Sequence, residues 1–429
     1  MPGRLNLFQA AMLRWRELAP YNAVHAAELP GPLDAPRLAA AVAAQVTAWG
    51  LSGFALDARR RRYEYAGGAA APEVTVLAGG SDPLAVLARE MQRQVELPFP
   101  ADGRFDPLRF FAVDAGATFH LGVAYDHFIA GGDSLVALIK GIACRYAGEA
   151  PPETPPPQRY PPAYRRLFAR NAGWAWLSVH WIPAILVRMA RAFRPRYAYG
   201  EDLRNAYTWF ELSADDHAAM ARTARAWQVT RNDLVIALLL QALAPLTPER
   251  LTARRRRELA IASVVNLRRH FPGTPATTFG QFLSSFFVSD PVAPDATLEA
   301  LARAVHVQSH RVKRLRLYLQ TLHFLAWGGL AWRFCTPGQR QRMDRKAHPV
   351  WGGVSLLAVD SLWRAAPGHA CALRYQRAIS TGPSTPVVLA PAGVGRGLVV
   401  GVSYRTAALR DEDIAKMIGT FVESVRSLR

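Results

Sequence analysis

The pattern of hydrophobic and polar positions changes from a strand period to a helix period at one histidine. Apolar residues at every second position of residues 119–125 predict a strand, and a Gly-Gly turn follows shortly after it. Apolar residues three and four positions apart then predict a helix over residues 134–146. His127 lies at the break between these elements, where a side chain can be directed into a cleft. It is either a hydrogen-bonded structural histidine or a chemically active one.

The same two periods predict helices and strands in alternation along the rest of the chain. Asp34 and Asp82 are suited to cap helices, Ser213 and Asp216 form a capping-box-like start, and Thr230 opens a strongly apolar helix. The expected helices are 5–18, 34–47, 82–94, one after 213, 230–243, 297–308 and 411–429. The expected strands are 23–29, 107–125, 208–213, 259–269, 278–289, 353–360, 386–392 and 397–404. This alternation predicts a mixed α/β protein.

The length of 429 residues exceeds what one ordinary core accommodates, so two large units are expected. A proline-rich segment, P-P-E-T-P-P-P-Q-R-Y-P-P, begins at residue 151 and is typical of a linker. We therefore expect an N-terminal subdomain over 1–150, a linker with a basic aromatic segment over 151–205, and a C-terminal subdomain over 206–429.

Charge is distributed unevenly between these parts. Residues 1–150 hold 14 Lys and Arg and 15 Asp and Glu, a net charge of −1, whereas residues 151–429 hold 38 and 18, a net charge of +20. A basic surface of this kind attracts nucleic acid, anionic lipid or an acidic carrier protein. The alternative is a solvated arginine-rich surface without a partner. Nucleic acid is the least favoured partner, because the arginines follow no known reader motif.

Residues 160–200 contain no acidic residue and combine arginines with tryptophans and branched aliphatic residues. The apolar centre, residues 174–187, is shorter than the ~18–20 residues that cross a bilayer. Basic flanks around such a centre are typical of a helix lying in an anionic membrane surface. The alternative is a helix packed on the protein with solvated arginines. The expected membrane contacts are Trp174, Trp176, Trp181, Arg188 and Arg191.

Several classes of chemistry lack support in the sequence. The phosphate-binding loops, the metalloprotease H-E-x-x-H, paired C-x-x-C and the hydrolase G-x-S-x-G are all absent, so we expect no metal site. Three distant cysteines indicate a reducing compartment, and the N-terminus does not resemble a secretory signal. We expect a cytoplasmic protein, with peripheral attachment to the inner face of the membrane as one option. A histidine of unperturbed pKa near ~6.5 suits general base catalysis.

The segment Y-D-H-F-I-A-G-G-D-S-L resembles the signature of condensation-domain acyltransferases, which include nonribosomal-peptide condensation domains and related CoA- or carrier-dependent enzymes. Their motif is H-H-x-x-x-D-G followed by Ser. His127 matches the catalytic histidine, Gly132 the motif Gly and Ser134 the Ser. Further matching segments follow in the family's order: G-P-L-D-A-P-R-L-A-A-A-V, V-T-R-N-D-L-V-I-A-L-L-L-Q-A-L, V-V-N-L-R-R, T-F-G-Q-F-L-S-S and the end from residue 382.

The resemblance implies two chloramphenicol-acetyltransferase-like subdomains that form a V with a tunnel between them. It also implies that His127 is the general base. The acyl donor would be acyl-CoA or a phosphopantetheinyl carrier, with no tightly bound cofactor, and the acceptor a hydroxyl or amine on a small molecule or lipid. The product would be an ester or amide of secondary or lipid metabolism.

Two motif positions depart from the family. Asp126 replaces the first motif histidine, and its simplest role is a solvated or salt-bridged carboxylate. Gly131 replaces the motif aspartate, which in the family pairs with an arginine, here Arg268. Asp133, two residues later, is a candidate to take over that pairing. Two functions are therefore considered: a thioester-dependent acyltransferase, and a non-catalytic binding module with a degraded motif.

Overall fold

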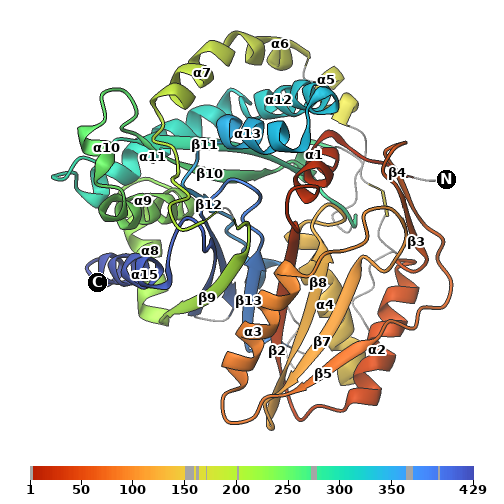
Figure 1. The fold of residues 1–429 in the computed structure, drawn as a ribbon. Helices are drawn as coiled ribbons and strands as arrows, with labels where there is room; N and C mark the ends of the chain where they lie inside the picture. Colours follow the sequence, from red (N-terminus) through yellow and green to blue (C-terminus); the bar gives the residue numbers. More distant parts are fainter. Residues whose placement is uncertain are drawn as a thin grey trace.

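The structure is a computed structural model, and it describes residues 3–149, 159–160, 164–170, 172–200, 202–271, 278–363, 371–394 and 397–429. Two large sheets, each covered by helices, lie beside each other (Figure 1). The mixed α/β class and the two sheet-containing subdomains predicted from the sequence are confirmed. Most of the proline-rich segment that begins at residue 151 lies outside the described residues.

The first sheet has five strands in the order β13-β2-β8-β7-β5. Its central strands β2 and β8 pair antiparallel, with Asn22 opposite Asp126. Side chains alternate between its faces, so Ala23 and Val123 belong to the core that contains α4, whereas Val24 belongs to the one that contains α3. The strands are β2 (Asn22–Pro30), β5 (Val74–Ala78), β7 (Leu108–Asp114), β8 (Thr118–Asp126) and β13 (Arg374–Ile379). The helices around it are α2 (Ala35–Ala48), α3 (Pro83–Glu96) and α4 (Gly132–Ala147).

Strand β13 connects the two parts of the chain. It comes from the 206–429 region but forms the edge of the first sheet, where Arg374–Ile379 pair with residues 23–28 of β2. Its backbone also passes close to β15: a Cβ on Gly401 would lie 1.9 Å from the carbonyl oxygen of Arg377. Only glycine permits this approach, so Gly401 allows the two sheets to meet. No pattern of hydrophobic and polar residues predicted this strand.

The second sheet has six strands in the order β11-β10-β12-β14-β15-β9. Helix α9 is almost entirely buried and packs against α11 and α15. The strands are β9 (Asn205–Leu212), β10 (Leu259–Asn266), β11 (Leu283–Asp290), β12 (Gly352–Val354), β14 (Val387–Val394) and β15 (Gly397–Arg405). The helices are α8 (Ala214–Ala226), α9 (Arg231–Leu243), α10 (Glu249–Thr252), α11 (Leu298–Arg314) and α15 (Asp411–Arg426).

The remaining elements surround the junction of the sheets. A small sheet, β1-β4-β3-β6, flanks the first sheet, and α1 packs against α12 of the C-terminal part. Helices α6 and α7 form an outer layer next to α12 (Figure 1). The strands are β1 (Gly3–Arg4), β3 (Phe54–Asp57), β4 (Arg62–Tyr65) and β6 (Gly103–Arg104). The helices are α1 (Leu7–Arg16), α5 (Tyr164–Arg170), α6 (Ala172–His180), α7 (Ile182–Arg191), α12 (Tyr318–Ala331), α13 (Pro337–Ala347) and α14 (Val359–Trp363), with short 3-10 turns at 244–246, 268–270 and 332–334.

The predicted helix starts are confirmed, because their signals are local. Asp34 and Asp82 accept hydrogen bonds from the third residue of their helices, and Ser213 and Thr230 form capping boxes with acidic partners. Three strand predictions were wrong in extent. The one expected at 259–269 ends at Asn266. The strand expected at 278–289 begins only at Leu283, since residues 278–281 run against the turn after His127, and the one expected at 353–360 ends at Val354.

Membrane-spanning elements were searched among the described residues. None of their helices is by itself long and apolar enough to cross a bilayer. One sharply bent pair, Ala214–Ala226 with Arg231–Leu246, meets the criteria of length and composition, and its second helix is part of the buried core.

Candidate functional site

His127 occupies the turn between the central strand β8 and helix α4. Its backbone N–H donates to the carbonyl of Tyr21, 3.1 Å away, so the turn is held against the start of β2. The imidazole lies between two aromatic rings, with centroid distances of 5.5 Å to Tyr21 and 5.6 Å to Tyr125. Packing on both sides restricts the rotation of the histidine ring.

Burial keeps His127 neutral. The residue is 8% exposed, and desolvation lowers its pKa to about 4. The positive charge of nearby Arg377 acts in the same direction, while the backbone carbonyls of His127 and Ala130 oppose it. Buried Nδ1 has no partner of ordinary hydrogen-bond geometry among the described residues. A neutral imidazole is the form that accepts a proton.

Two side-chain amides hold the turn that carries His127. Gln281 Nε2 donates to the carbonyls of His127 (3.0 Å) and Ala130 (3.2 Å), and Gln9 Nε2 donates to the carbonyl of Phe128 (3.0 Å). We call Gln9 and Gln281 the carboxamide brace. Both are fully buried, so their hydrogen bonds are shielded from water.

The brace is itself fixed at both ends. Gln9 belongs to the capping box that starts α1, where Asn6 is the cap. Asn6 also donates from Nδ2 to the carbonyl of Gln281, 2.9 Å away. Three segments distant in sequence therefore converge on the turn after β8.

Gly131 lies where the family motif has aspartate, and Gln281 fills the space next to it. A Cβ at Gly131 would lie 3.2 Å from Gln281 Oε1 and 3.6 Å from the carbonyl oxygen of Gly280. The backbone of Gly131 is extended, with φ −91° and ψ 166°, so any residue could adopt it. The close approach of Gln281 therefore favours a small residue at this position, whereas the backbone conformation does not select glycine.

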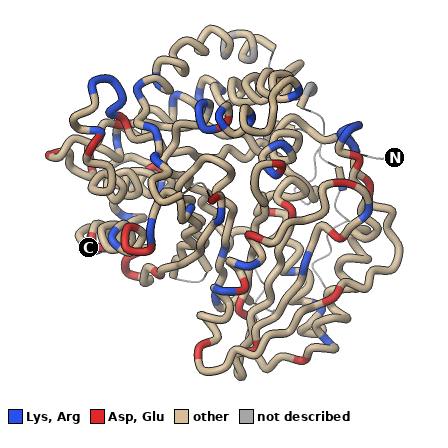
Figure 2. Tube along the Cα trace, viewed as in Figure 1, with Lys and Arg blue, Asp and Glu red and all other residues tan. Residues whose placement is uncertain are grey.

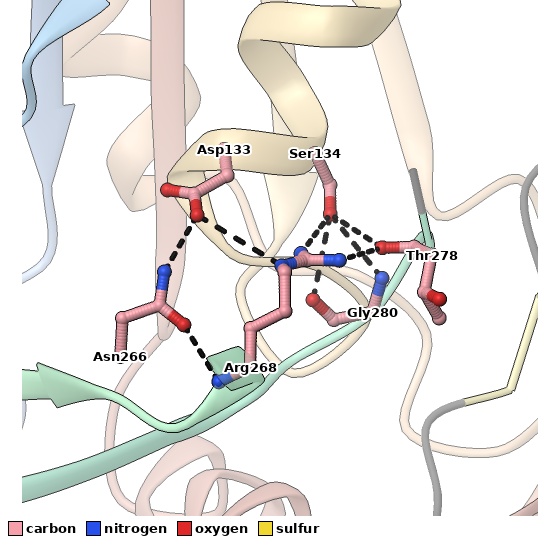
Figure 3. Close-up of polar contacts among 6 residues, drawn as sticks. All are labelled: Asp133, Ser134, Asn266, Arg268, Thr278 and Gly280. Atoms are coloured by element: carbon pink, nitrogen blue, oxygen red, sulfur yellow. Dashed lines mark hydrogen bonds and ion pairs between the residues drawn. The ribbon is translucent and has the colours of Figure 1, made fainter. Parts of the chain in front are cut away.

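Asp133 and Arg268 meet, but at a long distance. Arg268 Nε lies 3.9 Å from Asp133 Oδ2, and Asn266 Nδ2 donates to the same oxygen at 2.6 Å. The shorter contacts of Arg268 run from Nη1 to the carbonyl of Thr278 (2.5 Å) and from Nη2 to Ser134 Oγ (3.3 Å) (Figure 3). The arginine thus ties the start of α4 to the 278–280 segment, with Asp133 as a weaker partner.

Replacing Asp133 by asparagine is therefore expected to change little. An ion pair of this length between partly exposed groups contributes at most about 1 kcal/mol to the free energy of unfolding. Turnover and the melting temperature should both stay close to wild type. A loss of several kcal/mol or of most of the activity would show that Asp133 fully replaces the motif aspartate. Arg268→Gln, which also loses the bonds to Thr278 and Ser134, is the comparison and should be the more destabilising change.

Asp126 is salt-bridged and buried, and it is not solvated. It forms an ion pair with Arg16 of α1. Desolvation nevertheless raises the pKa of Asp126 to about 6, because burial outweighs the attraction of the arginine. The carboxylate at the first motif position is thereby used to hold α1 against the end of β8.

Behind Gly132 lies a second buried group of polar side chains. A Cβ on Gly132 would meet Arg377 Nη2 and His25 Cε1, each at 3.5 Å. Arg377 donates to the carbonyl (2.6 Å) and hydroxyl (3.2 Å) oxygens of Ser355, and His25 Nδ1 shares a hydrogen bond of 2.8 Å with the Tyr375 hydroxyl. This group brings the positive charge of Arg377 to the region of His127.

The residues expected to contact a membrane divide into two groups. Trp176 and Arg191 are exposed. Trp174 lies next to Arg316, Trp181 under Arg311, and Arg188 donates to Gln308 Oε1, 2.5 Å away. These three side chains are used in packing α6 and α7 on the protein.

Several residues of the site were not found from the sequence. Gln9, Arg16, Gln281 and Arg377 all contribute to the surroundings of His127, but they come from segments up to 250 residues from it. The local signals were the capping pattern N-L-F-Q at residues 6–9, which identifies a helix start, and the matching segment T-F-G-Q-F-L-S-S, which contains Gln281 but does not show its contacts.

Comparisons with known proteins give a likeness in structure alone. No protein-family model matches the chain, and no curated protein matches it significantly. The first condensation domain of the calcium-dependent antibiotic synthetase, in complex with a substrate analogue, has a TM-score of 0.74 and 17% identity, over 100% of this chain and 97% of that one.

Two further solved structures resemble the chain over nearly its whole length. The SgcC5 protein from Streptomyces globisporus has a TM-score of 0.70 and 16% identity, covering 99% of this chain and 98% of that one. The X-domain from teicoplanin biosynthesis has a TM-score of 0.60 and 18% identity, covering 99% and 94%. The chain therefore has the condensation-domain fold, as its motifs predicted.

Proposed function

We propose that the protein is an acyltransferase that moves an acyl group from a thioester to a hydroxyl or amine, with His127 as general base. The observation that carries this proposal is the position of His127: a buried, neutral imidazole in the turn between β8 and α4. The turn lies against the 278–281 segment of the C-terminal part, so the histidine is near the junction of the two sheets.

The reaction needs one proton acceptor and one leaving group. Neutral His127 takes the proton from the acceptor O–H or N–H, and the acceptor attacks the thioester carbonyl carbon. The tetrahedral oxyanion collapses, the carbon–sulfur bond breaks, and the thiolate takes the proton from the imidazolium. The products are an ester or amide and a free thiol, so atoms and charges balance without a further reactant.

The carboxamide brace takes the role that the motif aspartate has in the resemblance. Its hydrogen bonds to the carbonyls of His127, Phe128 and Ala130 fix the turn through neutral groups. His127 can therefore be held in position as a base although Gly131 replaces the motif aspartate. This is the reason for preferring an enzyme over a degraded module.

The donor proposed is an acyl group on an acidic carrier protein or on CoA. The net charge of +20 over residues 151–429 supports electrostatic attraction of either one. Carrier binding should accordingly weaken as ionic strength rises.

The second candidate is a non-catalytic binding module. Gly131 at the aspartate position favours it, as does the likeness to the teicoplanin X-domain, which has been solved in complex with OxyB (TM-score 0.61, 17% identity). Such a module would bind a partner protein through the same fold without using His127 as a base.

A thioester assay separates the two candidates. Purified protein is incubated with acyl-CoA and acyl-carrier donors and a panel of hydroxyl and amine acceptors, and free thiol and acylated product are both measured. Product that depends on His127 supports the enzyme. Absence of product with every donor and acceptor pair, or equal product from His127→Ala, supports the binding module.

The pH dependence of the reaction provides a further prediction. His127 acts only when neutral, and burial lowers its pKa to about 4 from the ordinary ~6.5. With a hydroxyl acceptor, kcat/KM should therefore be constant from neutral pH down to about pH 5 and fall with a midpoint near 4. Stopped assays across this range measure it, with Tm followed in parallel to exclude unfolding. A midpoint near 6.5 would contradict a buried base.

A further inference from the structure

Helices α6 and α7 expose apolar side chains on the outside of the molecule. Trp176 is 68% exposed, Leu186 and Val187 are each 51% exposed, and Val179 is also open to solvent. On α7 the exposed residues are 183, 184, 186, 187, 190 and 191, and their spacing places them on one broad helix face. Large exposed apolar patches of this kind mark interaction sites.

The neighbouring helix α12 extends this apolar surface. Trp327 is 69% exposed, Leu330 is exposed one turn later, and Phe334 in the following 3-10 turn is 82% exposed. Helix α6 packs beside α12. We call the exposed residues Trp176, Val179, Leu186, Val187, Trp327, Leu330 and Phe334 the apolar ledge.

The ledge is held on the protein from its inner side. Arg311 of α11 stacks on Trp181, with its guanidinium carbon 4.2 Å from the ring centroid, and Arg188 donates to Gln308 and to the carbonyl of Phe287. The inward faces of α6 and α7 thus have partners. Their outward apolar face has none among the described residues of this chain.

The charges around the ledge are mostly positive. Residues 160–200 and 300–343 contain no acidic residue, and Asp344, the next one, is buried. Exposed cations include Arg191, Arg333 and Arg342. Figure 2 accordingly shows no acidic position along the two outermost helices. The nearest exposed acidic residue is Glu17, which is paired with Arg340 and accepts a hydrogen bond from Trp332 Nε1. An apolar surface with an excess of cations around it matches an anionic lipid surface, whereas a protein partner would need an acidic and apolar face of the same shape.

A basic groove adjoins the ledge. It measures about 420 Å³ and is lined by His306, Val307, His310, Arg311, Arg314 and Leu315 of α11. Arg311 is fixed by its stacking on Trp181, and His306 by a hydrogen bond of 2.8 Å from Nδ1 to Asp233. The wall of the groove is mainly apolar, and the exposed side chains of Arg311 and Arg314 on the same helix supply the cations for a phosphate.

We propose that this face docks on an anionic membrane, with the apolar ledge in the lipid interface and the α11 groove binding a lipid phosphate. This inference is independent of the proposed acyl transfer. It places the protein beside a lipid-soluble acceptor or product, and it revises the expected contacts from Trp174, Trp181 and Arg188 to the ledge itself.

Vesicle binding tests the proposal. The full chain is sedimented with vesicles of phosphatidylcholine alone and with vesicles that also contain phosphatidylglycerol. We expect binding to the anionic vesicles only, a blue shift of tryptophan fluorescence, and weakening by salt. Binding to neither vesicle at low ionic strength, or equal binding to both, would overturn the proposal.

Substitutions locate the contact. Trp327→Ser with Phe334→Ser should lower the vesicle partition coefficient at least ~tenfold, and Arg314→Gln should lower it about fivefold. The matched control is Val76→Ser with Leu373→Ser, two exposed apolar residues elsewhere, which should bind like wild type. Equal loss in the control, or no loss in the ledge variant, would refute the assignment.

Two other occupants of the ledge are distinguished by further measurements. Self-association in solution that Trp327→Ser with Phe334→Ser abolishes, without vesicle binding, would identify a second copy as the occupant and overturn the proposal. Inorganic phosphate and a short-chain phosphatidylglycerol are titrated separately. Displacement from vesicles by the soluble lipid and not by phosphate at equal concentration supports a lipid headgroup, whereas equal displacement by both would refute the lipid assignment of the groove.

Discussion

Replacing His127 by glutamine is expected to lower the rate of acyl transfer by a factor of ~10²–10⁴, the usual contribution of a positioned general base. Glutamine approximates the size of histidine and cannot take the acceptor proton at neutral pH. The effect should fall on kcat, since the imidazole acts on the proton in transit and is not required to bind the acyl chain. Initial rates over a range of acceptor concentrations measure this.

The matched control is His120→Gln. His120 is a buried histidine on the same strand, β8, seven residues from His127 and paired with the other end of β2. The His120→Gln variant should be less stable than the wild type, but each folded molecule should turn over substrate at the wild-type rate. Wild-type turnover in His127→Gln would exclude the base, and an equal loss in both variants would show that the effect arises from damage to the strand.

Restoring the family aspartate at position 131 is expected to destabilise this protein. In Gly131→Asp the new carboxylate would be buried next to Gln281 Oε1, an acceptor that cannot donate to it. Burying an unpaired charge should lower the free energy of unfolding by several kcal/mol, about 3 as a central value. Gly131→Ala, which adds only the 3.2 Å contact, should cost about 1 kcal/mol or less. Chemical denaturation measures both.

The substitution that tests the carboxamide brace directly is Gln281→Met, which keeps the side-chain volume and removes the hydrogen-bond donor. Two buried carbonyls, of His127 and Ala130, then lose their hydrogen bonds, at a cost of about 2–4 kcal/mol. The turn should loosen, so kcat should fall more than the folded fraction does. If the aspartate of Gly131→Asp interacts with Gln281, the double variant should deviate from additivity by ~0.5–3 kcal/mol. Additive effects, or full turnover in Gln281→Met, would contradict the brace.

Local signals in the sequence were reliable where the structure depends on local interactions. Capping side chains at Asp34, Asp82, Ser213 and Thr230 start helices because they bond backbone groups three residues away. The helices within 311–346 were not predicted, because aromatic and basic residues on all sides hide the helical period there. Strand β13 is short and was missed for lack of any local signal that it pairs with β2.

The sequence predicted the central residue of the site, His127, but it did not predict the residues that hold His127 in place. His127 stands out because a strand period changes to a helix period around it. The carboxamide brace depends on Gln9 and Gln281, whose contacts with the turn span more than 100 positions of the chain. No period or spacing reveals such pairs. The replacement of the motif aspartate could therefore be noticed in the sequence, but its compensation could be identified only in three dimensions.

The pairing of β13 with β2 also limits how substrates can enter. The two sheets cannot separate as rigid bodies unless the pairing between Arg374–Ile379 and residues 23–28 is broken. The close contact at Gly401 restrains the same movement from the side of β15. The position of the two sheets relative to each other is thus set when the chain folds, and it cannot adjust to a substrate by a rigid opening of the molecule.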